Sequence, residues 1–198
     1  MAAPDSTLAD TIRPLVAAHP GVSGLVALDE GGDAFAARIQ LAEAAEHTID
    51  AQYYIWHHDN AGTLLLQALL RAADRGVKVR LLLDDNNTDG LDDLLAALNT
   101  HRCIQVRVFN PFPLRRLRWL GLIADFARLN RRMHNKSFTV DGVATLVGGR
   151  NIGDEYFGTG EGVQFVDLDV FAIGHVVDHR ADREHVEVDD VAADFERY

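Results

Sequence analysis

The apolar positions of this chain recur with two periods that alternate along the sequence. Helical spacing is clearest over residues 33–47 and 61–75, and the second segment runs into Gly76, a residue typical of helix ends. A short β-rich run follows each segment, TIDAQYYIW at 48–56 and VKVRLLL at 77–83. The second run is mostly apolar, as in a strand buried on both faces. A strand, a helix and a strand in this order predict a βαβ unit with parallel strands.

The same alternation continues along the rest of the chain. Asp141-Gly142 separates two β-rich runs and is the strongest short hairpin signal in the sequence. No internal repeat or linker interrupts the pattern, so we expect one α/β domain. The other expected elements are a helix over 91–98, strands over 104–108, 136–140, 143–147 and 166–173, and a last helix near 188–198.

Composition narrows the classes of protein that fit. The 198 residues are 47% apolar, and 19 basic against 30 acidic residues give a net charge of −11. Such a chain can bury one sizeable core, and its acidity argues against a general nucleic-acid binder. The single cysteine, Cys103, excludes an intramolecular disulfide framework and fits a reducing compartment. Because the sequence shows no signal-peptide pattern and no run of 18 apolar residues, we expect a cytoplasmic protein.

Charge is distributed unevenly along the chain. Residues 101–136 hold nine Lys and Arg residues and one acid, whereas residues 151–198 hold thirteen acids and three arginines. The basic window either concentrates an anionic ligand at one place or is an ordinary solvated face balanced by the acids. Within it, residues 111–133 interleave large apolar residues with six arginines. This pattern favours either a helix lying at an anionic bilayer, as a peripheral membrane contact, or a helix packed on a further domain.

The candidate chemistry is concentrated between residues 131 and 157. His134 and Lys136 are two positions apart in a β-rich run, so their side chains share the face that Phe138 and Val140 continue. An imidazole and an ammonium make a poor structural pair but a good phosphate-handling pair. The neutral imidazole can attack phosphorus while the ammonium stabilises the developing negative charge. Taken alone, the pair also fits a core histidine beside a lysine that reaches to solvent.

The surrounding residues complete a long pattern, H-x-K-x(4)-D-x(6)-G-G-x-N. Its members are His134, Lys136, Asp141, Gly148, Gly149 and Asn151. With this pattern the chain resembles the phospholipase D superfamily and its HKD motif. The similarity extends to DAFAARIQLAEAAEHTIDAQYYIW, RGVKVRLLLDDNNTDGLDDLL, FNPF and DLDVFAIG, which resemble the N-terminal half of a bacterial cardiolipin synthase, most nearly the C-type subgroup.

This resemblance implies a fold and a division of the chain. The fold is a phospholipase D-like mixed β-sheet flanked by helices in a single domain. Residues 1–32 would be an N-terminal lead-in, and residues 33–177 the phospholipase D-like domain with one HKD motif. Residues 178–198 diverge from the family, and we expect the chain to be truncated there before a second domain.

The resemblance also implies an activity and roles for the motif residues. The family transfers a phosphatidyl group through a covalent phosphohistidine, with no metal and no organic cofactor, on a glycerophospholipid such as phosphatidylglycerol. His134 would be the nucleophile, Lys136 the clamp on the phosphate oxygen, and Asn151 a further donor to it. Backbone N–H groups of Gly148 and Gly149 would approach the anion closely. The family often has serine where Gly149 stands.

Two acidic residues need separate interpretation. Seven residues of extended strand place Asp141 about 23 Å from His134, too far for its carboxylate to orient the imidazole unless the chain folds back. Although Asp141 belongs to the catalytic motif, we therefore favour a role in shaping the Asp-Gly turn. A better candidate for orienting the imidazole is Asp167, because a carboxylate that accepts from one ring nitrogen leaves the other free to attack. A surface carboxylate on a strand is the alternative for Asp167.

The chemistry requires a second histidine that the sequence does not contain. Phosphodiester exchange needs a group that protonates the departing alkoxide and later takes a proton from the acceptor. Full-length relatives take it from a second HKD half, and no second H-x-K-x(4)-D occurs here. We therefore expect a half-enzyme whose partner is a missing C-terminal domain. The alternatives are a homodimeric, single-motif phospholipase D or nuclease-type phosphodiesterase, and an inactive fragment.

Three other features have simpler interpretations. The DNNTDG segment starts like a calcium loop, but Ala96 stands where the bidentate glutamate should be. His57-His58-Asp59 is interpreted as solvated residues, so we predict no metal site. Tyr53, Tyr54 and Trp56 are expected in the core, with alternate rings as candidates for lining the cleft.

Overall fold

One mixed β-sheet organises the whole molecule. The computed structural model describes residues 5–88, 90–111, 132–160, 162 and 164–174. Its seven strands lie in the order β1-β7-β6-β5-β2-β3-β4. The strands are β1 (Gly24–Leu28), β2 (Thr48–Tyr53), β3 (Lys78–Asp84), β4 (Ile104–Phe109), β5 (Lys136–Val140), β6 (Ala144–Gly148) and β7 (Asp169–Ile173). The helices are α1 (Thr7–Ala17), α2 (Gly31–Ala44), α3 (Asn60–Asp74), the 3-10 turn η1 (Asp85–Asn87), α4 (Asp92–Leu98) and α7 (Asp154–Phe157).

The sheet is mixed, as predicted. β2, β3 and β4 run parallel to one another, which confirms the predicted βαβ unit, with α3 as its crossover helix. The other strand pairs are antiparallel. The predicted α/β fold, a mixed sheet with flanking helices in a single domain, is therefore confirmed.

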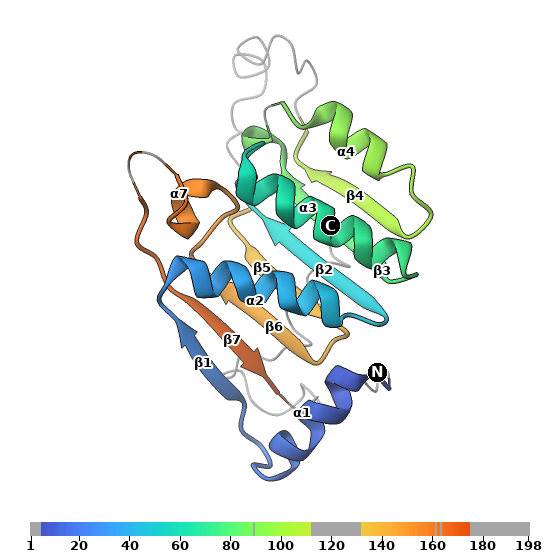
Figure 1. Cartoon of the computed structure of the whole chain (residues 1–198), viewed down its shortest axis with the longest axis vertical. Helices are drawn as coiled ribbons and strands as arrows, with labels where there is room; N and C mark the ends of the chain where they lie inside the picture. The colour runs from blue at the N-terminus through green and yellow to red at the C-terminus, as the bar shows by residue number, and fades with distance from the viewer. Residues whose placement is uncertain (1–4, 89, 112–131, 161, 163, 175–198) are drawn as a thin grey trace.

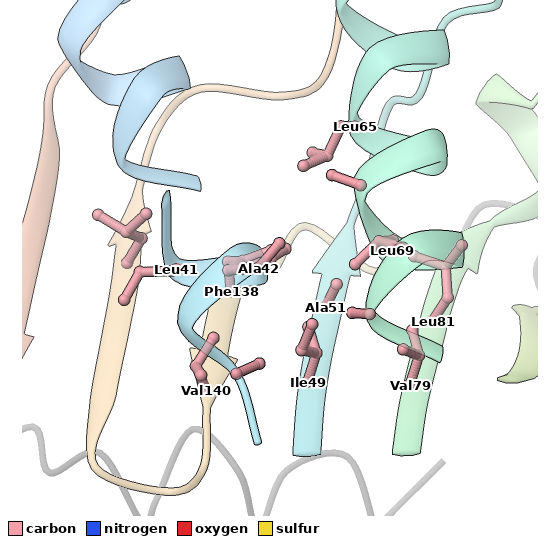
Figure 2. Close-up of a cluster of buried hydrophobic side chains, with 14 of the residues drawn as sticks. Leu41, Ala42, Ile49, Ala51, Leu65, Leu69, Val79, Leu81, Phe138 and Val140 are labelled. Atoms are coloured by element: carbon pink, nitrogen blue, oxygen red, sulfur yellow. The ribbon is translucent and has the colours of Figure 1, made fainter. Parts of the chain in front are cut away.

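The core lies between the sheet and two helices. α2 and α3 lie side by side across one face of the sheet (Figure 1). Leu41, Leu65 and Leu69 of these helices contribute to a buried cluster on the strands below (Figure 2). Because side chains alternate along a strand, Ala51 and its cross-strand partner Phe138 share this face. The predicted buried face of β5, carrying Phe138 and Val140, is therefore the helix-covered one.

Element ends differ from the predictions where long-range hydrogen bonds intervene. The strand predicted over 48–56 ends at Tyr53, because the next residues leave the ladder and the Ile55 N–H donates to the side-chain oxygen of Asn151 (3.0 Å). The strand predicted over 166–173 begins at Asp169. The predicted segments 111–133, for the most part, and 188–198 lie outside the described residues.

The first 32 residues contribute to the same sheet. β1 pairs antiparallel with β7 along its whole length, from Gly24 opposite Ile173 to Leu28 opposite Asp169. It forms one edge of the sheet, and α1 precedes it. The segment predicted as a lead-in thus supplies an edge strand. Among the described residues, no helix has the length and apolar character needed to cross a membrane.

Candidate active site

The motif pair lies where β5 begins, beside the end of β2. Lys136 is the first residue of β5 and pairs with Tyr53, the last residue of β2. His134 precedes the strand and is exposed, whereas Lys136 is partly buried. The prediction that both residues lie on the strand is thus correct only for Lys136. The Lys136 ammonium donates to the backbone oxygen of His134 (2.8 Å), which ties the two residues together.

Neighbouring strands hold the segment that carries His134. The Met133 N–H donates to the buried carboxylate of Asp84, at the end of β3 (3.0 Å). On the other side of the histidine, the Asn135 amide donates to Gln52 of β2 (2.9 Å). His134 therefore projects from a backbone that is fixed on both sides.

An aromatic ring faces both motif side chains. The rings of Tyr54 and His134 have centroids 4.3 Å apart and planes tilted by 34°. The Lys136 ammonium lies 5.6 Å from the centroid of the same ring. Tyr54 follows β2 directly and is partly buried.

The electrostatic surroundings of Lys136 are mixed. Burial lowers the pKa of Lys136, and the Asp167 carboxylate opposes that shift. Asp167 also accepts from the Leu168 N–H (2.9 Å). Between Asp167 and His134, both among the described residues, the structure shows no hydrogen bond. Asp167 is therefore near enough to act electrostatically on the lysine of the pair.

The glycine pair is packed closely against the segment that leads into β7. The Gly149 N–H donates to the Leu168 oxygen (3.1 Å). A side chain at Gly149 would collide with the Asp167 carboxylate, 1.8 Å from an ideal Cβ position. One at Gly148 would lie 2.1 Å from an Asp169 carboxylate oxygen and 2.5 Å from the Leu168 backbone. Asp167 therefore fills the space that a side chain at position 149 would occupy.

Asn151 connects the loop that carries Gly148 and Gly149, called the glycine loop below, to the residues that follow β2, which include Tyr54. Its side-chain oxygen accepts from the Ile55 N–H, and its amide nitrogen donates to the Tyr156 hydroxyl (3.2 Å). Tyr156 is buried, and its ring stacks on Phe165 at 5.1 Å. Burial raises the pKa of Tyr156, so the phenol stays neutral near pH 7. The described residues thus place both ends of the Asn151 amide in contact with protein, and its predicted role as a donor to phosphate stays a prediction.

Asp141 lies at the opposite end of β5 and is not brought to His134. Its buried carboxylate accepts from the backbone N–H groups of Glu46 (3.1 Å), His47 (2.8 Å) and Thr48 (2.8 Å). The predicted hairpin turn forms, with positive φ at Asp141 (52°) and Gly142 (65°). Its place among the catalytic residues is thus not supported by this geometry, because its carboxylate fastens the hairpin to the start of β2.

A buried cluster of charges lies behind the glycine loop. Asp169 is fully buried, and its carboxylate lies 2.9 Å from Arg38 and 3.8 Å from Arg150. The same carboxylate accepts from the Arg150 N–H (3.3 Å). Arg38, buried within α2, also donates to the Tyr53 hydroxyl (2.9 Å). Burial lowers the pKa of Arg38, but Tyr53 and Asp169 raise it more, so the guanidinium stays charged.

Comparison with known proteins identifies the family. A model described as "Cardiolipin synthase, PLD-like domain" matches residues 38–167. The chain belongs to this phospholipase D-like family. It is 63% identical over 191 residues to cardiolipin synthase C of Escherichia coli, which covers 96% of this chain and 38% of that protein. It is 37% identical over 134 residues to a cardiolipin synthase of Geobacillus thermodenitrificans, covering 68% of this chain and 25% of that protein. The chain therefore spans well under half the length of these relatives, and the family predicted from the motif is confirmed.

Solved structures share the phospholipase D-like fold. NucT from Helicobacter pylori superposes with a TM-score of 0.59 at 14% identity, over 89% of this chain and 94% of that chain. A phosphatidylserine synthase from Haemophilus influenzae superposes with a TM-score of 0.56 at 16% identity, over 88% of this chain and 43% of that chain. At these identities the likeness establishes the fold alone.

Within the part of the chain that the structure describes, one group of side chains could hold a metal ion. Ligand atoms of His57, Asp59 and Glu155 lie within 4.8 Å of one another. These groups already have protein partners, because His57 pairs with Glu155 (3.1 Å) and Asp59 accepts from the N–H groups of Gly62 and Asp154. The contacts fix the starts of α3 and α7 next to each other.

The motif pattern did not reveal several residues that shape this site. Tyr54 was one of three aromatic residues expected in the core or the cleft, and the structure separates them. Tyr53 and Trp56 are fully buried, and Tyr54 alone of the three contacts the motif pair. The motif contains Asn151 but gave no indication that Tyr156 would contact it. Nothing in the sequence placed Arg38 near Asp169. For Tyr54, the sequence indicated only that a tyrosine stands next to the end of a predicted strand.

Proposed function

We propose that this chain forms a phosphatidyl-transferring half-site of the cardiolipin synthase type. The observation that carries the proposal is the pairing of His134 with Lys136 at the start of β5, in a chain of this family. The exposed imidazole is accessible to a substrate, and the ammonium beside it supplies a positive charge for a phosphate oxygen.

The proposed first step forms one bond and breaks one. A ring nitrogen of His134 attacks the phosphorus of a glycerophospholipid such as phosphatidylglycerol, and the phosphorus–oxygen bond to the headgroup alcohol breaks. The departing oxygen takes a proton from a general acid. In the second step an acceptor hydroxyl attacks the phosphohistidine and gives its proton to the same group, which restores the imidazole. The N–H groups of Lys136 and Asn151, with the backbone of Gly148 and Gly149, stabilise the phosphate oxygens. The steps require no metal or organic cofactor.

We propose that a second half-site supplies the proton donor. The sequence holds one H-x-K-x(4)-D pattern, and each step needs an acid or base opposite the nucleophile. Either a further domain or a second copy of the chain would bring the second histidine. The imidazole-orienting role predicted for Asp167 stays a prediction.

We also propose that the chain acts at the cytoplasmic surface of the inner membrane as a peripheral protein. The phosphodiester of a glycerophospholipid lies at the headgroup level of a bilayer, where an exposed nucleophile can reach it. The basic window at 101–136 would favour anionic lipid, although much of it lies outside the described residues.

Trapping the covalent intermediate tests the activity. The chain is incubated with phosphatidylglycerol labelled at phosphorus and quenched in alkali, which preserves phosphohistidine. We expect label on the protein that disappears in His134→Ala. The matched control is His58→Ala, which removes an exposed histidine outside the motif. Label that persists in His134→Ala would overturn the nucleophile assignment, and absence of label from the unaltered chain would show that one chain does not transfer a phosphatidyl group without the second half-site.

A further inference from the structure

We propose that Tyr54 is a positioning residue that holds the motif pair in its reactive arrangement. The proposal rests on the proposed function, because positioning is for attack by His134 on phosphorus. The HKD motif does not include Tyr54, which lies 80 residues before the nucleophile.

The geometry joins one ring to both motif side chains. The imidazole of His134 lies against the Tyr54 ring with centroids 4.3 Å apart, and the Lys136 ammonium lies 5.6 Å from the same centroid. His134 is exposed, so without a neighbouring surface its side chain would sample several rotamers. Stacking on Tyr54 restricts that sampling.

The Tyr54 ring is itself held by its neighbours in sequence. Tyr53 is buried, and its hydroxyl accepts from Arg38 (2.9 Å). The Ile55 N–H donates to Asn151 (3.0 Å), and the N–H of buried Trp56 donates to the Asn87 oxygen (3.2 Å). Its neighbours in sequence, Tyr53, Ile55 and Trp56, are therefore each held by a hydrogen bond, and Asn151 supports the nucleophile indirectly through this segment.

The chemistry explains why an aromatic ring suits this place. A nucleophile held in a near-attack orientation avoids the entropy cost of finding it during each turnover. When the imidazole attacks phosphorus it takes on positive charge, and the face of an aromatic ring attracts a cation. The Lys136 ammonium also lies near this ring, 5.6 Å from its centroid, so one side chain contacts both members of the motif pair.

Kinetics of two Tyr54 variants test the role. Tyr54→Leu removes the ring, and we expect kcat for phosphatidyl transfer to fall by about tenfold to a hundredfold, with KM changed by less than about twofold. Tyr54→Phe keeps the ring and should restore kcat to within about twofold. Thermal unfolding of each variant is measured in parallel, so that loss of fold is not mistaken for loss of positioning.

A spectroscopic measurement tests the stack without any substrate. The Tyr54 ring current displaces the imidazole C–H proton resonances of His134 in the NMR spectrum, and these resonances are assigned by their absence in His134→Ala. We expect Tyr54→Leu to remove the displacement and Tyr54→Phe to retain it. Phe165→Leu is the matched control, because Phe165 stacks on Tyr156 rather than on His134.

The two measurements separate the proposals. If the unaltered chain neither transfers a phosphatidyl group nor forms a phosphohistidine with a substrate whose leaving group needs no proton, but the resonances respond as expected, the proposed function fails and the stacking stands. Unchanged His134 resonances in Tyr54→Leu would overturn the positioning role, as would an equal loss of kcat in Tyr54→Leu and Tyr54→Phe.

Discussion

At the scale of single residues, we expect the charge on Lys136 to set the pH range over which the proposed site binds phosphate. Burial lowers the pKa of Lys136, so its ammonium loses a proton at a lower pH than an ordinary lysine. Since kcat/KM reports on the free enzyme, it should fall on the alkaline side below the usual lysine range. The Asp167 carboxylate opposes the shift, so Asp167→Asn should move this alkaline limb to lower pH. The pH profile of kcat/KM, recorded for the unaltered chain and for Asp167→Asn, measures the position of this limb.

The same profile distinguishes the two roles considered for Asp167. A carboxylate acting on Lys136 changes the position of the alkaline limb and leaves the plateau nearly unchanged. A carboxylate orienting His134 lowers the plateau at every pH and leaves the limb in place. The electrostatic interaction between Asp167 and Lys136 favours the first outcome, because the described residues show no hydrogen bond from Asp167 to His134.

Asp141 illustrates a motif residue that acts through the fold. Its carboxylate accepts three backbone N–H groups, and asparagine tolerates the same positive φ. Asp141→Asn therefore removes the charge while keeping the turn. We expect the free energy of unfolding in urea to fall by about 2 kcal/mol, with phosphohistidine formation in the folded protein unchanged.

A matched acid provides the control for this prediction. Asp33 is exposed in the first turn of α2, so Asp33→Asn should change the free energy of unfolding by less than about 0.5 kcal/mol. Normal stability of Asp141→Asn together with lost labelling of His134 would show that Asp141 has a catalytic role after all.

At the scale of elements, the cluster of Arg38, Asp169 and Arg150 joins α2, β7 and the glycine loop. Removing one member of a buried ion pair leaves an uncompensated charge, so Arg38→Met should cost about 3 kcal/mol. Asp169→Asn should cost a similar amount because it leaves two buried guanidinium groups together. In the double variant the two losses should overlap, and the total cost should be at least about 1 kcal/mol below the sum.

Urea denaturation of the unaltered chain, the two single variants and the double variant measures the coupling free energy between Arg38 and Asp169. Arg13 offers a surface comparison, because its side chain is half exposed and pairs with Asp10 (2.8 Å). Arg13→Met should cost under about 1 kcal/mol. Strict additivity of Arg38→Met and Asp169→Asn would show that the buried cluster is not a unit.

The elements themselves could be predicted from sequence because their signals are local. Periodicity located α2, α3 and most of the strands, and Asp141-Gly142 located the β5–β6 hairpin. The motif located His134 and Lys136 and, through them, the family. Periodicity cannot reveal which distant backbone groups a side chain meets. The three acceptor contacts of Asp141, the Arg38–Asp169 pair and the Tyr54–His134 stack each join residues more than 75 positions apart.

At the scale of the whole molecule, the net charge of −11 says little about the ligand. Lys136, with its positive charge, adjoins His134, and the acids are concentrated in other segments. In the proposed function, binding of one phosphodiester depends on these local charges. Completion of the proposed reaction depends on a second half-site, so the state of association becomes part of the proposed mechanism.

A substrate with a good leaving group can separate the two half-sites. Bis(p-nitrophenyl) phosphate releases nitrophenolate without a proton, so attack by His134 needs no general acid. In a monomeric fraction of the chain we expect a burst of nitrophenolate of about one equivalent per chain, followed by slow release, because hydrolysis of the phosphohistidine still needs a base from the proposed second half-site. A fraction that light scattering shows to be dimeric should turn over continuously if a second copy supplies that base. His134→Ala should show no burst in either fraction. Continuous turnover by the monomer at the dimer's rate would show that one chain contains the complete site.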